Sequence, residues 1–193
     1  MKVLFLDNDG VICLSHNWGS RYKKTKAYSN PNPNGEHTKP VEFRFDNFDT
    51  KAIGVLNNIL TETGAEYVIS SDWRYHATLE ELQGYYLSKG VVKAPIDMTP
   101  HTKDINPAWW SRFNNYAHIE HERVIEIKYW LEQHPEVTNW VAVDDLNLGV
   151  YGKKPFENEI FNPDGLTNFV LTPNSNEGIK QTGIKDKILK HLK

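Results

Sequence analysis

The sequence lacks several features that would direct it to a particular compartment or partner. Its 193 residues include one cysteine, Cys13, so no internal disulfide can form and a reducing compartment is expected. No apolar run approaches the length of a membrane span, and the N-terminus has no basic leader. The formal net charge is only -3, so no global field draws the chain onto nucleic acid or membrane. We therefore expect a soluble, cytoplasmic protein with no membrane partner.

An acidic turn follows the first apolar run of the chain. Residues 3–6 predict a buried parallel strand, and Asp7, Asn8, Asp9 and Gly10 come directly after it. Ligands of open α/β sheets bind beyond the carboxyl ends of strands, so both carboxylates are expected in a polar crevice. Gly10 would allow a sharp turn that brings backbone amides near an anion. The alternative is an ordinary solvated turn, because all three residue types are common in turns.

The next segment, residues 15–48, is polar and rich in turn-forming residues. Within it, residues 21–28 and 39–45 alternate as strands do, and the run between them from Ser29 to Gly35 favours a turn. This pattern predicts a small β-hairpin flap, or cap, beside the acidic turn. Its basic and aromatic residues could contact phosphates and bases, although a solvated edge protected by lysines is the commoner role.

A second buried strand, residues 65–69, follows a helix that Asp49 is expected to cap. It ends in Ser70 and Ser71, whose hydroxyl and backbone groups can donate hydrogen bonds to an anion. The alternative is that Ser71 or Asp72 only caps the helical turn that follows. We treat Ser70 as a candidate phosphate ligand in either case.

Two cations and a second acidic pair come later in the chain. The helical periodicity over residues 120–133 carries Arg123 near its start and Lys128 further along. A third buried strand then ends in Asp144 and Asp145. Adjacent carboxylates at a strand end are unfavourable unless a cation neutralises them, so this pair predicts a metal or a basic partner.

Together these elements predict an α/β fold of three layers, with a Rossmann-like parallel sheet flanked by helices. A further strand at residues 168–171 and a closing helix at 184–192 complete the pattern. We find no internal repeat and no interdomain linker. Residues 1–193 are therefore expected to form one domain, with 15–48 inserted in it as the flap.

The order of these parts resembles the haloacid dehalogenase superfamily of phosphotransferases. Asp7 and Asp9 match the first motif of that superfamily, Ser70 the second, and Asp144 with Asp145 the fourth. The third motif is a basic residue, which leaves Arg123 and Lys128 as candidates.

One branch of the superfamily resembles the chain more closely. The segments 68–74, 123–131 and 169–173, the last followed by Gly178 and Ile179, are similar to the domain associated with "Swiss army knife" RNA repair proteins. That likeness favours Arg123 over Lys128 as the third-motif cation. The long flap after the first motif departs from the pattern of the branch.

The resemblance implies a magnesium-dependent phosphatase. Asp7 would attack phosphorus and form an aspartyl-phosphate, while Asp9 would protonate the leaving oxygen and later deprotonate water. Mg²⁺ would be held by Asp7, the backbone carbonyl of Asp9 and Asp144, with Asp145 behind these ligands or bridged to the ion by water. Ser70, Arg123 and the amides after Asp9 would stabilise the phosphate oxygens.

The resemblance also suggests a phosphorylated nucleotide or nucleic-acid end as substrate. Candidate substrate contacts are Gly10, Ser71, Arg74 and Lys128, although Arg74 could instead pair with a neighbouring carboxylate. The weakly negative charge keeps a small metabolite as a rival substrate. A module that binds nucleic-acid ends without turnover is a further alternative. A receiver-type signalling domain is less compatible, because its phosphoacceptor would come from the strand that here ends in Ser70.

Overall fold

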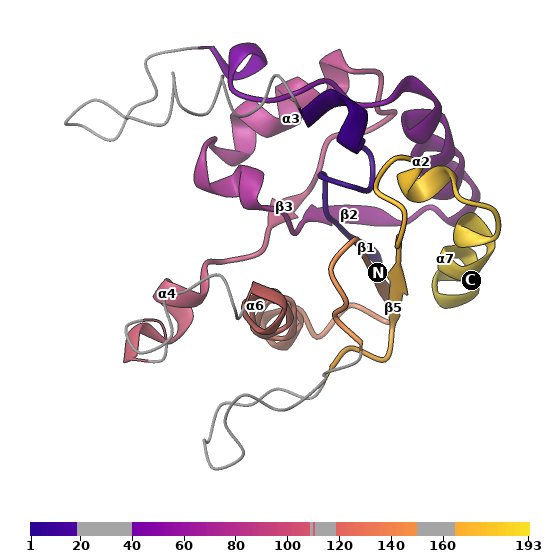
Figure 1. Ribbon diagram of the computed structural model, residues 1–193. Helices are drawn as coiled ribbons and strands as arrows, with labels where there is room; N and C mark the ends of the chain where they lie inside the picture. The colour runs from indigo at the N-terminus through magenta and orange to yellow at the C-terminus, as the bar shows by residue number, and fades with distance from the viewer. Residues whose placement is uncertain (19–39, 109, 111–118, 150–164) are drawn as a thin grey trace.

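The computed structural model describes residues 1–18, 40–108, 110, 119–149 and 165–193, and these form an α/β fold around one parallel sheet (Figure 1). The sheet has five strands in the order β3-β2-β1-β4-β5, and every neighbouring pair is parallel. The strands are β1 Lys2–Leu6, β2 Glu66–Ile69, β3 Asp97–Met98, β4 Asn139–Asp144 and β5 Phe169–Leu171.

The strand order places a topological switch point beside β1. The chain runs from β1 outward to β2 and β3, and then returns to the other side of β1 for β4 and β5. Leu6 is in register with both Ile69 of β2 and Val143 of β4, so the three central strands end at the same level. Open α/β sheets bind ligands in the crevice at such a point. Asp7 and Asp144 both lie at it.

Helices cover both faces of the sheet, as the alternation of buried residues in β1 requires. Leu4 and Leu6 pack in one apolar cluster with the helices α2 (Thr50–Thr63), α3 (Leu79–Ser88) and α7 (Ile184–Leu192). Val3 and Phe5 point to the other face and pack against α6 (Ile119–Gln133). Figure 1 shows α2 and α7 on one side of the sheet and α6 on the other. The fold therefore has three layers.

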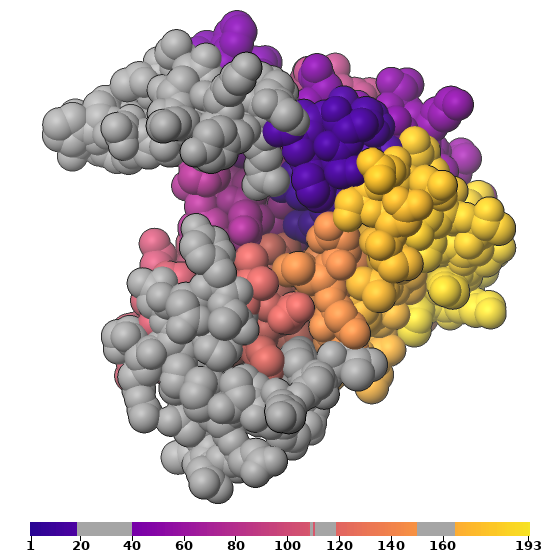
Figure 2. All heavy atoms as spheres, in the orientation of Figure 1, coloured from indigo at the N-terminus to yellow at the C-terminus, as the bar shows by residue number. Residues whose placement is uncertain are grey.

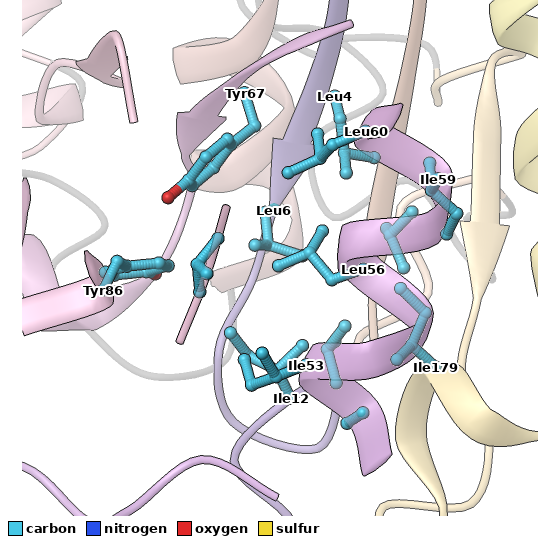
Figure 3. Close-up of a cluster of buried hydrophobic side chains, with 14 of the residues drawn as sticks. Leu4, Leu6, Ile12, Ile53, Leu56, Ile59, Leu60, Tyr67, Tyr86 and Ile179 are labelled. Atoms are coloured by element: carbon cyan, nitrogen blue, oxygen red, sulfur yellow. The ribbon is translucent and has the colours of Figure 1, made fainter. Parts of the chain in front are cut away.

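Helix α2 shows how local signals and packing agree. Its N-cap Asp49 accepts a hydrogen bond from the amide of Ala52 at 2.8 Å, and Gly64 ends the helix with a φ of 64°. The N-cap is the residue that the sequence predicts. Figure 3 shows Leu56 and Leu60 of this helix directed toward Leu6 and Leu4 of β1, while Ile59 lies on the side of the helix where Ile179 is found.

Segments from the two ends of the chain meet beside the switch point. The amide of Ile179, in the short helix η5 (Gly178–Lys180), donates to the carbonyl of Val11 at 2.9 Å. The amide of Ser15 donates to the carbonyl of Ser175, also at 2.9 Å. Figure 2 shows the N-terminal residues in indigo adjoining the C-terminal segment in yellow. This contact fixes the loop that follows β1.

The remaining described elements are short. The helix α4 covers Thr102–Ile105, and single turns form η1 (Ser15–Asn17), η2 (Val41–Phe43) and η3 (Asp72–Tyr75). Within the described ranges, no helix combines the length and the apolar composition that a membrane span needs.

The parallel sheet flanked by helices confirms the predicted fold class, but the predicted hairpin is not observed. Residues 19–39, which hold its first strand and turn, lie outside the described residues. In place of the second strand, predicted over residues 39–45, the described part has the helical turn η2. The consecutive residues Arg44 and Phe45 are both buried, whereas a strand would send them to opposite faces. Arg44 binds Glu81 through both terminal nitrogens at 2.7 Å, and this ion pair replaces strand pairing.

Candidate active site

Three carboxylates meet at the carboxyl ends of β1 and β4. Asp7 directly follows β1, and its amide donates to the carbonyl of Val143 at 3.0 Å, which ties it to the neighbouring strand. Asp144 is the last residue of β4, and Asp145 follows it. One carboxylate oxygen from each aspartate lies within 4.8 Å of the other two. Asp7 and Asp144 are buried and Asp145 is partly buried, so a small cation could bind all three at once.

Arg123 of α6 offsets part of the negative charge of this cluster. Its Nη1 lies 3.0 Å from Asp7 Oδ1 and 3.5 Å from Asp144 Oδ2, and it also donates to the carbonyl of Ser70. Its Nη2 binds Asp72 Oδ1 at 2.9 Å. The Arg123 side chain is 3% exposed. A planar guanidinium thereby links the ends of β1, β2 and β4 in one buried network.

Burial and mutual repulsion make the charged form of the aspartates unfavourable. Burial raises the pKa of Asp7 well above its ordinary value, and the Asp144 charge adds to this while Arg123 opposes it. Burial likewise raises the pKa of Asp144 to about 7, against the opposing effect of Arg123. Burial lowers the pKa of Arg123, but Asp144, Asp7 and Asp72 together raise it above its usual range. One arginine therefore does not fully compensate the acidic cluster.

The donor set fits a hard divalent cation. Carboxylate oxygens are the ligands that Mg²⁺ prefers. The raised pKa values of Asp7 and Asp144 indicate that their negative charge is not fully compensated by Arg123. The residues that would hold the ion are Asp7, Asp144 and Asp145. The carboxylate of Asp9 lies outside this group. Its backbone carbonyl as a further ligand stays a prediction.

Gly10 allows Asp145 to approach the turn after β1. It has a φ of 74°, and a Cβ atom added to it would lie 2.1 Å from Asp145 Oδ2. The same oxygen accepts a hydrogen bond from Ser175 Oγ at 3.1 Å. A side chain at position 10 would therefore displace a metal-site carboxylate.

The backbone amides after Asp9 do not serve the role that the sequence suggested. The amide of Gly10 donates to the carbonyl of Cys13 at 2.8 Å, and those of Val11, Ile12 and Cys13 all donate to the carbonyl of Asn8. These four donors close the turn on itself, so none of them is directed at an anion. Gly10 contributes to the site through the space it leaves and not through its amide.

Asp9 is oriented by a residue of the second motif. Its Oδ2 accepts a hydrogen bond from Trp73 Nε1 at 2.9 Å. Between the two aspartates, Asn8 points the other way, and its Oδ1 accepts a hydrogen bond from the buried hydroxyl of Tyr86. Asp9 lies close enough to Asp7 for its charge to add to the raised pKa of Asp7.

The serines of the second motif are buried beside the cluster. The amide of Ser70 donates to the carbonyl of Leu6, and Ser70 Oγ has no hydrogen-bond partner among the described residues. Ser71 Oγ is also buried without a hydrogen-bond partner among the described residues. Ser71 is the N-cap of η3, but its side chain makes no capping hydrogen bond. Buried hydroxyls are usually satisfied, so both have spare capacity for a ligand.

The positions of Arg74 and Lys128 do not favour the substrate contacts that the sequence suggested for them. Arg74 is buried, donates from Nη1 to the carbonyl of Ser71 at 3.0 Å, and pairs through Nη2 with Glu126 of α6. This is the carboxylate pairing that the sequence left as the alternative. Lys128 lies five residues after Arg123 on α6, which turns it roughly 140° around the helix axis. Of the two cations, Arg123 is the one with a recorded contact to Asp7.

Sequence reasoning missed three residues that organise the site. Asp72, considered as a cap, binds Arg123, while Trp73 binds Asp9 and Glu126 binds Arg74. Glu126 also accepts hydrogen bonds from the amide and hydroxyl of Thr102 at the start of α4. One feature of the sequence could have pointed to Glu126, because it lies three residues after Arg123 and therefore on the same face of the helix.

The strand order and the acidic cluster together define the structural class of the protein. A parallel sheet of order 3-2-1-4-5, with acidic residues after β1 and β4 and a buried arginine between them, is the arrangement of a haloacid dehalogenase (HAD)-like domain. Residues 3–181 match the family described as the HAD domain in Swiss Army Knife RNA repair proteins, and the chain belongs to this family. The resemblance noted in the sequence is thereby confirmed. No curated protein and no solved structure matches the chain significantly.

Cation binding should depend on pH. The folded-state pKa of Asp144 is about 7 against an ordinary 3.8, so the folded state retains a proton that the unfolded chain releases. Without divalent cations, the contribution of this group to stability is full below pH 4 and is lost as the pH rises through 7. The shift of Asp7 has the same direction. We expect the melting temperature in EDTA to fall over this window, and the rise caused by Mg²⁺ to grow with pH.

The measurement is thermal unfolding from pH 4.5 to 8, with EDTA or Mg²⁺. Asp144→Asn is the control, because it removes one of the two titrating groups and should make both curves less steep. A Mg²⁺-induced shift that is the same at every pH would contradict the account.

The close approach of Gly10 to Asp145 yields a second prediction. Gly10→Ala should weaken Mg²⁺ binding by about 10–100-fold, the effect usual for residues that orient ligands. Gly64→Ala is the matched control, because Gly64 also has a positive φ but has open space around its Cβ position. Both variants should lose stability through backbone strain, and calorimetric titration with Mg²⁺ should show weaker binding only in Gly10→Ala. Equal affinities in the two variants would be evidence against this role of Gly10.

Proposed function

We propose that the chain is a Mg²⁺-dependent phosphomonoester hydrolase that acts through an aspartyl-phosphate intermediate. The observation that carries the proposal is the meeting of Asp7, Asp144 and Asp145 at the switch point, with Arg123 beside Asp7. These residues come from opposite ends of the chain, and a solvated strand end would not need to bury them together. Membership in the HAD family supports the same chemistry.

Asp7 is the nucleophile in this proposal. One of its carboxylate oxygens forms a bond to phosphorus as the ester P–O bond breaks on the opposite side. Asp9 gives its proton to the leaving oxygen, so the alcohol departs neutral. A water molecule then attacks phosphorus and returns a proton to Asp9. This second step releases inorganic phosphate and restores the Asp7 carboxylate.

The other residues stabilise charge on the phosphoryl group. Arg123 would exchange its contact with Asp7 for the phosphoryl oxygens, and Ser70 Oγ would donate to them. Mg²⁺, when bound to Asp7, Asp144 and Asp145, supplies a fixed positive charge that offsets the repulsion between the Asp7 carboxylate and the anionic substrate. Asp72 keeps the Arg123 side chain in place through its other terminal nitrogen.

We propose a phosphorylated nucleotide or the phosphorylated end of RNA or DNA as the substrate. The support is membership in a family of domains from RNA repair proteins. The formal net charge of -3 favours a short substrate over a long one, because binding of long nucleic acid depends on many phosphate contacts to basic residues. A small non-nucleotide phosphate ester is the rival substrate.

Phosphate release tests the proposed reaction. With Mg²⁺, the wild type should hydrolyse p-nitrophenyl phosphate, and EDTA should abolish turnover. Asp7→Asn should reduce turnover to the background rate, because the amide is a poor nucleophile at phosphorus. Asp9→Asn should reduce turnover about 10²–10⁴-fold, because the water that cleaves the intermediate then has no general base to take its proton. Asp104→Asn, at an exposed position on α4, is the matched control and should keep full activity.

A substrate panel follows with the same proteins. It contains 5′- and 3′-nucleoside monophosphates, oligonucleotides phosphorylated at either end, and sugar phosphates. Preference for the nucleotide members supports the proposed substrate class, and preference for sugar phosphates supports the rival. Binding of oligonucleotide ends without any phosphate release would favour a module that lacks turnover and would overturn the proposed reaction.

A further inference from the structure

Trp73 makes one polar contact that is recorded in the structure, and that contact is with Asp9. The Trp73 side chain is 1% exposed, and its Nε1 lies 2.9 Å from Asp9 Oδ2. A buried indole N–H needs an acceptor, and a carboxylate oxygen is a strong one. The bond joins the turn after β1 to the helix η3 after β2. It therefore connects the first and second motifs directly.

The indole ring is held in place on several sides. It stacks on Phe45, with ring centroids 4.3 Å apart and planes 7° from parallel, and on Phe48 at 5.3 Å and 13°. Tyr85 of α3 packs against its edge at 5.9 Å and 67°. All three rings are buried. With the ring fixed in this way, the direction of its N–H bond is fixed as well.

We propose that Trp73 is the positioning residue of the general acid, an inference that rests on the proposed function. An indole N–H can only donate, so Asp9 Oδ2 accepts, and because a carbonyl oxygen accepts more strongly than a hydroxyl oxygen the transferable proton is favoured on Oδ1. Trp73 thereby sets which carboxyl oxygen serves the leaving group and holds the carboxyl plane against rotation. Phe45 and Phe48, at the end of the segment inserted after the first motif, support it. The packing of Phe45 and Phe48 thus affects the orientation of the Asp9 carboxyl group through Trp73.

The inference predicts a selective defect. Protonation by Asp9 matters when the leaving oxygen is strongly basic, and matters little when it is a weakly basic phenolate. Loss of the Trp73 N–H should therefore harm the hydrolysis of poor leaving groups far more than that of good ones. If Trp73 only filled the core, its replacement would affect all substrates alike.

The test uses three esters of similar shape with increasingly good leaving groups: benzyl, phenyl and p-nitrophenyl phosphate. The value of kcat/KM is measured for each, because it reports the step that releases the leaving group. Two variants remove the N–H. Trp73→Phe keeps an aromatic ring, and 3-benzothienylalanine at position 73 replaces only the N–H by sulfur, so that packing is retained if Trp73→Phe folds poorly.

Trp130 offers a matched control on the other face of the sheet. It is also a buried tryptophan whose Nε1 donates to an aspartate, Asp97 Oδ2, at 2.6 Å. The same two replacements at position 130 remove an equivalent hydrogen bond outside the candidate active site. They should lower kcat/KM for the three esters by a common factor or leave it unchanged.

At position 73 we expect kcat/KM to fall about 10–100-fold for benzyl phosphate and less than about threefold for p-nitrophenyl phosphate, with phenyl phosphate between them. An equal fall for all three esters, or no fall, would overturn the role of Trp73 while leaving the phosphatase intact. A wild type that hydrolyses none of the esters and no member of the substrate panel would instead overturn the proposed function, and the inference with it.

Discussion

The buried contact of Arg123 with Asp7 and Asp144 is the constraint on which the rest of the site depends. Three acidic side chains gathered in a crevice repel one another, and burial strengthens that repulsion. Arg123 offsets part of the charge and is itself held by Asp72. Removing one partner from a buried ionic network typically costs about 3–5 kcal/mol, because the others are left uncompensated. The remaining imbalance is what makes the site receptive to a divalent cation.

The sheet provides the geometry that brings these groups together. Asp7 and Asp144 are far apart in sequence, yet β1 and β4 are neighbours whose carboxyl ends lie level. Parallel strands need long crossover connections, so helices separate the motifs in sequence while the strand ends bring them together in space. This arrangement explains why the residues that follow the predicted strands were enough to locate the acidic cluster. An apolar run followed by a carboxylate or hydroxyl residue predicts both a strand and the edge of the sheet at which it ends.

What the sequence did not reveal depends on contacts between distant segments. The caps of α2 and the helix periods are local, and they were predictable. Arg74 could pair with a substrate phosphate or a carboxylate, and only the packing of α6 decides for Glu126. In the inserted segment, the alternation of residues 39–45 favoured a strand, but Arg44 turns inward to Glu81 and a helical turn forms instead. A partly buried ion pair outweighed strand propensity in that segment.

The helix η3 shows how one short element can serve several partners. A 3₁₀ helix has three residues per turn, so consecutive side chains leave it about 120° apart. Asp72 reaches Arg123, Trp73 reaches Asp9, and Arg74 reaches Glu126. An α-helix would rotate each successive side chain by about 100°, and the three would cover less of the circumference. The tight turn after β2 is therefore suited to hold Arg123, Asp9 and Glu126 at the same time.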